Sequence, residues 1–161
     1  MTINMTVPLE VGIACRDLPA LRRFYEDTMG FTFVSEFTIG ADKSTPAGLS
    51  ADGYTVVRLQ TSYGERIKLL APNVLPVVQP QVDFILDRPN AVYLTFIIDD
   101  INTAITRLLA VGIDFISGPV RVEVRPGVYL AFCRDPEGNV LELVQYDDIS
   151  SYRPDLITRI G

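Results

Sequence analysis

Apolar and polar residues follow one another along this chain in two similar series. Residues 9–31 begin with an alternating apolar stretch, continue with apolar positions at helical spacing, and end near Gly30. Asp17 precedes the helical positions and suits an N-terminal cap, and the Leu-Pro that follows suits a first helical turn. Residues 92–115 repeat this order, with Asp100 in the place of Asp17. The pattern predicts a strand followed by a helix in each half of the chain.

Each predicted helix is followed by segments typical of strands. They are rich in β-branched and aromatic residues, and turn residues separate them. In the first half they span 31–39, 54–60 and 66–71, and in the second they span 114–116 extended through 120–124, 128–133 and 139–145. The sequence DPEGN at 135–139 predicts a tight hairpin turn between the last two. We therefore predict an α+β protein made of two tandem βαβββ modules.

The length of 161 residues suits one domain that contains both modules. We place the first module at about 7–72 and the second at about 90–147. The segment 72–89 contains four prolines and is expected to be a linker without regular structure. The tail 148–161 is expected to extend a sheet edge or reach a partner chain, and 43–50 to form a flexible loop that covers the site.

Composition excludes several classes of function. A net charge of −6 argues against a nucleic-acid surface, and no apolar stretch is long enough for a membrane span. The sequence has no histidine, which excludes imidazole-based catalytic triads and histidine-ligated metal sites. Two cysteines, Cys15 and Cys133, are too few for a disulfide framework and favour a cytoplasmic location. Cys133, with no histidine to activate it, is expected to be a packing residue.

Strand alternation predicts which side chains point away from the helices. Four polar residues, Glu10, Lys68, Tyr93 and Glu142, fall at equivalent places of the two modules on the helix-free face of each sheet, which we call the open face. Glu142 is either a general base or substrate anchor, or an ion-paired structural group. Lys68 binds an anion or serves as a counter-ion, Tyr93 donates a hydrogen bond or packs, and Glu10 contacts a ligand or solvent. We expect a small-molecule ligand or substrate there.

The two modules, the segment EVGIACRDLPALRRFYEDTMGF and the closing RDPEGNVLELVQ resemble the vicinal oxygen chelate superfamily. That superfamily includes glyoxalase I, methylmalonyl-CoA epimerase, extradiol dioxygenases, fosfomycin-resistance thiol transferases and bleomycin-resistance proteins. The resemblance covers about residues 7–147 and implies a curved sheet in each half, with the site inside the curve. It also implies pairing of modules, and we expect a homodimer.

Metal-binding members of that superfamily place their ligands at four strand positions, which fall here on Glu10, Lys68, Tyr93 and Glu142. Only Glu142 keeps a typical ligand type, and the Lys68 ammonium repels a cation. We therefore expect no metal cofactor. The resemblance implies a metal-independent glyoxalase-like enzyme, an isomerase or lyase that moves a proton next to a carbonyl. The alternative is a non-catalytic binding protein of the bleomycin-resistance type.

Overall fold

In the computed structural model, which describes residues 2–157, aspartate caps start the main helix of each half. The Asp17 carboxylate accepts a hydrogen bond from the Ala20 amide at 2.9 Å. Helix α1 (Leu18–Arg23) follows and continues as one π-helical turn, η1 (Phe24–Thr28). Asp100 accepts from the Thr103 amide at 3.0 Å and starts α3 (Ile101–Ala110). The Thr103 hydroxyl, ahead of that amide, lowers the pKa of Asp100. Both predicted caps are therefore present.

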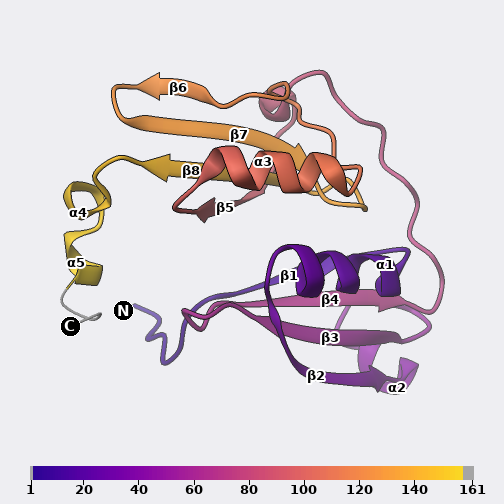
Figure 1. Cartoon of the computed structure of the whole chain (residues 1–161). Coiled ribbons are helices and arrows are strands. Elements are labelled where there is room, and N and C mark those ends of the chain that lie inside the picture. Colours follow the sequence, from indigo (N-terminus) through magenta and orange to yellow (C-terminus); the bar gives the residue numbers. More distant parts are fainter. Residues whose placement is uncertain (1, 158–161) are drawn as a thin grey trace. The chain divides into compact units, whose positions relative to one another are not determined.

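The chain divides into two units, the first ending at Gln81 and the second beginning at Val82. The first unit is a four-stranded sheet in the order β1-β4-β3-β2, with α1 along one face (Figure 1). β1 and β4 are parallel, and the other pairs are antiparallel. Its strands and short helix are β1 (Glu10–Ala14), β2 (Thr32–Ile39), α2 (Ala41–Ser44), β3 (Tyr54–Gln60) and β4 (Arg66–Pro72).

The second unit has the same topology, with strand order β5-β8-β7-β6 and α3 on one face (Figure 1). β5 and β8 are parallel, and the other neighbours are antiparallel. Its elements are η2 (Ile85–Asp87), β5 (Tyr93–Ile97), β6 (Val122–Arg125), β7 (Val128–Arg134), β8 (Val140–Tyr146), α4 (Ile149–Tyr152) and α5 (Pro154–Ile157). The predicted α+β class and the tandem βαβββ modules are confirmed.

Each unit has its own core between the helix and one face of the sheet. In the first unit, Leu21 and Tyr25 of the helical segment are buried, as are Leu59 and Leu69 of the sheet. In the second, the fully buried side chains include Ile101, Leu141, Leu143 and Cys133. These sheet residues alternate with the polar positions of the open face, so burial of one face leaves the other available.

Four segments differ from the expectation. Residues 114–116 do not form a strand, because only Phe115 bridges to Cys133 before the chain turns at Gly118, where φ is +86°. The loop 43–50 is anchored, since Ser44 is fully buried and donates to the Ser50 carbonyl at 2.7 Å. The proline-rich segment includes the short helix η2, and the described part of the tail forms α4 and α5. Tail residues 158–161 lie outside the described residues.

No helix between residues 2 and 157 is both long and apolar enough to cross a bilayer.

Candidate functional site

The open face of the first unit brings Glu10 and Lys68 onto neighbouring strands. In the parallel β1–β4 pair, Glu10 aligns with Arg66 and Gly12 with Lys68, so the two predicted site residues are offset by two positions. The Glu10 carboxylate lies 3.9 Å from an Arg66 guanidinium nitrogen. Arg66, rather than Lys68, is therefore the ion-pair partner of Glu10.

Lys68 faces another cation. In the antiparallel β3–β4 pair Lys68 lies directly opposite Arg58, and the Arg58 guanidinium covers the Phe37 ring at 4.8 Å from its centre. Neither Lys68 nor Arg58 is in an ion pair with any residue between 2 and 157. Lys68 is expected to bind an anion or serve as a counter-ion, and its cross-strand neighbour in this unit is positive.

Glu142 and Tyr93 occupy the corresponding face of the second unit. Glu142 aligns with Thr95, whose hydroxyl donates to the Glu142 carboxylate at 2.6 Å. Tyr93 lies two positions before Thr95, at the start of β5, and packs edge-on against Phe132, with ring centres 5.3 Å apart. Thr95 therefore orients the carboxylate, and the Tyr93 ring packs beside it on the same face.

A pocket of about 380 Å³ lies on this open face. Glu142 and Arg125 supply its charges, and aliphatic side chains from four strands supply most of the remaining wall. The lining residues are Thr95, Ile97, Val124, Arg125, Val128, Leu130, Glu142, Val144, Tyr146 and Tyr152. A partly apolar hollow with a few polar groups is typical of small-molecule sites.

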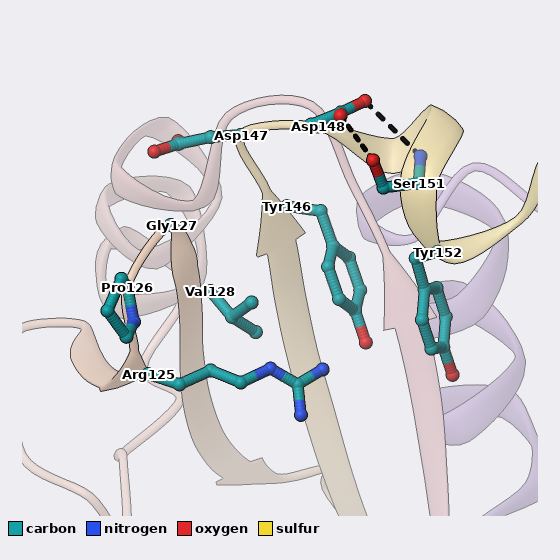
Figure 2. A pocket seen from close by; sticks show the side chains of 9 residues that line it. All are labelled: Arg125, Pro126, Gly127, Val128, Tyr146, Asp147, Asp148, Ser151 and Tyr152. Carbon is teal, nitrogen blue, oxygen red and sulfur yellow. Dashed lines mark hydrogen bonds between the residues drawn. The ribbon is translucent and has the colours of Figure 1, made fainter.

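An adjoining pocket of about 340 Å³ lies where the tail meets the sheet (Figure 2). Tyr152 of α4 stacks on Tyr146 of β8, with ring centres 4.3 Å apart and planes 11° apart. Figure 2 shows the Arg125 guanidinium extending toward Tyr146. Burial, ahead of the contact with the Tyr152 hydroxyl, raises the pKa of Tyr146. Tyr146 thus stays a neutral phenol over the ordinary working range of a protein.

Sequence reasoning missed Thr95, Tyr146 and Tyr152 as site residues. Alternation already placed Thr95 beside Tyr93 on the open face, and Tyr146 follows Glu142 at the same parity. Tyr152 had no comparable signal, because its place depends on how the tail packs.

Cys133 is not a nucleophile in this structure. Its side chain is fully buried in the core of the second unit. Burial, followed by the charge of Asp135, raises the pKa of the Cys133 thiol to about 12. The predicted packing role agrees with this environment. Neither Cys133 nor Cys15 is in a disulfide.

The residues present do not fit a divalent metal. Arg66 neutralises Glu10 and Lys68 adds a further positive charge beside it, while the Tyr93 ring is engaged with Phe132. Within residues 2–157 no three carboxylate or thiol groups are close enough to share an ion. Glu142 is the one remaining donor of the four positions, and one carboxylate is a poor site for a hard cation. Glu10 and Lys68 belong to the first unit, and Tyr93 and Glu142 belong to the second. The convergence of all four residues on one site therefore stays a prediction.

These features define a class of small α+β proteins with a duplicated sheet whose one face is covered by a helix in each half. The sequence model of the Glyoxalase/Bleomycin resistance protein/Dioxygenase superfamily matches residues 3–143, and the chain belongs to this superfamily. No curated protein matches the chain.

Solved structures resemble the fold at low sequence identity. A glyoxalase family protein from Bacillus cereus aligns with a TM-score of 0.75 at 19% identity, covering 91% of this chain and 98% of that one. A glyoxalase/bleomycin resistance protein/dioxygenase domain from Frankia sp. aligns with a TM-score of 0.67 at 16% identity, covering 90% of this chain and 95% of that one. The V278E mutant of glyoxalase I from Zea mays aligns with a TM-score of 0.63 at 16% identity, covering 88% of this chain and 45% of that one. At these identities the likeness concerns the fold.

Proposed function

We propose that this protein is a metal-independent enzyme of the isomerase or lyase type, which moves a proton next to the carbonyl of a small organic molecule. The observation that supports this most is the Glu142 carboxylate, held by Thr95 at 2.6 Å in a pocket that aliphatic and polar side chains line in equal part. A base that a hydrogen bond positions in a partly apolar pocket is suited to abstract a carbon-bound proton.

The pocket also holds groups that stabilise the product of that step. Glu142 takes the proton from the carbon beside the carbonyl, and the electron pair of the broken C–H bond moves onto the carbonyl oxygen. Arg125 and the neutral Tyr146 phenol line the same pocket and are donors for that oxyanion. In a 2-hydroxy carbonyl compound, delivery of the proton to the former carbonyl carbon, with transfer of the hydroxyl proton to the oxyanion, completes an isomerisation. Departure of a group from the carbon next to the one that lost the proton completes an elimination. Tyr93 lies on the same open face as Glu142. In the first unit, we propose Lys68 and Glu10 as ligand-contacting groups of that unit's own open face.

Replacement of Glu142 by glutamine tests the proposed base. We expect solvent deuterium to enter the α-carbon of accepted carbonyl compounds with wild-type protein, measured by proton NMR over a panel of 2-oxo acids, 2-hydroxy ketones and acyl thioesters. Glu142→Gln should slow that exchange by about 100-fold or more, as loss of a general base typically does. Chelator should leave the wild-type rate unchanged.

A matched variant separates the base from its support. Thr95→Val removes the hydroxyl that orients the carboxylate but keeps its shape, so a smaller loss of rate is expected. Equal exchange rates for Glu142→Gln and the wild type on every accepted compound would overturn the proposal.

The second candidate is a binding protein that holds a small molecule without chemistry. The stacked Tyr146 and Tyr152 rings favour it, because they lie next to Asp147 and Asp148 and form an aromatic, acidic margin suited to a cation. Equilibrium dialysis against bleomycin distinguishes the two functions. Stoichiometric binding without any deuterium exchange supports the binding protein.

We also propose a cytoplasmic homodimer. Two buried cysteines outside any disulfide suit a reducing compartment, and both sheets have edge strands that pairing would cover. Sedimentation velocity at micromolar concentration should give about twice the chain mass of 17.9 kDa, and a species of single-chain mass would contradict the dimer.

A further inference from the structure

We infer that Arg58 and Lys68, on the open face of the first unit, form a binding site for a small doubly charged oxyanion, the group carried by organic phosphates and dicarboxylates. The inference goes beyond the proposed function, which concerns Glu142 of the second unit. The binding itself is carried by the first unit alone.

The main observation is a pair of cationic residues at one cross-strand position of the sheet. Lys68 and Arg58 are direct cross-strand partners in the β3–β4 ladder, and both side chains are half-buried. Directly opposed side chains of a sheet come within about 5.5 Å at Cβ, and like charges there are destabilising. No carboxylate among residues 2–157 forms an ion pair with either of them. A bound dianion relieves the repulsion that the protein alone leaves in place.

A third cation is held next to this pair. Arg66 lies two positions from Lys68 on the same face of β4, where its Nε donates to Gln60 at 2.7 Å and it pairs loosely with Glu10. This face therefore presents three cationic side chains against one carboxylate, in a protein whose net charge is −6. Such a local reversal of sign concentrates anions at the face.

The contact of Arg58 with Phe37 also gives the Arg58 guanidinium a defined orientation for the anion. Phe37 supports the Arg58 guanidinium through the face of its ring at 4.8 Å, which fixes the plane of a group that binds oxyanions with two parallel hydrogen bonds. The adjoining strand β1 presents the small, exposed residues Gly12 and Ala14. A Cβ built on Gly12 would lie 3.2 Å from Leu70 Cδ1 and 3.9 Å from Lys68 Cε, so these two side chains already lie over Gly12.

Isothermal titration at fixed ionic strength tests the site, with inorganic phosphate and malonate as probes and chloride as the reference. We expect saturable binding to the wild type. Lys68→Gln and Arg58→Gln should each weaken it by about 10-fold or more, since a charge-assisted hydrogen bond contributes that much to affinity. Lys43→Gln is the matched control, because Lys43 is exposed and pairs with Asp42 at 3.6 Å in the same unit, and it should bind as the wild type does.

The two probes identify the chemistry, since stronger binding of phosphate indicates a phosphate ester and stronger binding of malonate a dicarboxylate. Glu142→Gln lies in the other unit and should bind either anion normally while losing deuterium exchange. If the wild type and the variants bind anions as expected but none of them shows deuterium exchange, the proposed reaction is rejected and the anion site is kept. Absence of saturable binding to the wild type, or equal affinity in Lys68→Gln, Arg58→Gln and Lys43→Gln, would overturn the anion site and leave the proposed base standing.

Discussion

Asp135→Ala is expected to lower the free energy of unfolding of the second unit by about 2–4 kcal/mol, the range for removing a buried charged acceptor with several hydrogen bonds. Asp135 is only 4% exposed. Its carboxylate accepts from the amides of Glu137 and Asn139, each at 2.9 Å, and from the Asn139 side chain at 2.8 Å. Alanine would leave these donors in the β7–β8 turn without an acceptor.

Urea denaturation followed by circular dichroism measures this loss. Asp135→Asn should cost less, because its amide oxygen can still accept from both backbone groups while the Asn139 amide rotates to present its oxygen. Asp114→Ala removes an exposed carboxylate of the same unit and should change stability by less than about 0.5 kcal/mol. Equal effects of Asp135→Ala and Asp114→Ala would show that the turn does not depend on this carboxylate.

Tyr25→Ala is expected to lower the free energy of unfolding of the first unit by about 3–5 kcal/mol, the range for truncating a buried aromatic ring. Tyr25 is completely buried and makes edge-on contacts with Phe24 at 5.1 Å and Phe31 at 5.4 Å between ring centres. Its removal would leave a cavity at the π-helical turn, where two neighbouring rings lose their main partner.

The same unit offers a control for the loss of a tyrosine as such. Tyr63 is 73% exposed, so Tyr63→Ala should be nearly neutral. Melting temperature and the urea midpoint should both fall for Tyr25→Ala, and a result within error of Tyr63→Ala would contradict the aromatic cluster.

The fold was largely predictable because its determinants are local. Alternation delimits β3 at Tyr54–Gln60, as expected from residues 54–60, and the capping aspartates begin both main helices. Residues 114–116 were predicted wrongly as a strand. Their apolar character suits one, but a turn at Gly118 allows only a single bridge to Cys133.

The candidate site was less predictable, because partners depend on register. Alternation assigns Glu10, Lys68 and Glu142 to open faces but does not show which side chain lies across from each. The pairing of Glu10 with Arg66, and of Glu142 with Thr95, follows from strand alignment. The stacking of Tyr152 on Tyr146 depends on the tail, whose short helices have little periodicity of their own.

The equivalent alignment of Gly12 with Lys68 and of Thr95 with Glu142 has a consequence for how such proteins change. The same strand position of the duplicated fold holds a cation, Lys68, in the first unit and an anion, Glu142, in the second. Because each core is built from the strand residues that face the helix, either open-face position tolerates a reversal of charge without disturbing the packing beneath the helix. Evolution or protein engineering can therefore change the ligand specificity of each unit separately while the fold stays the same.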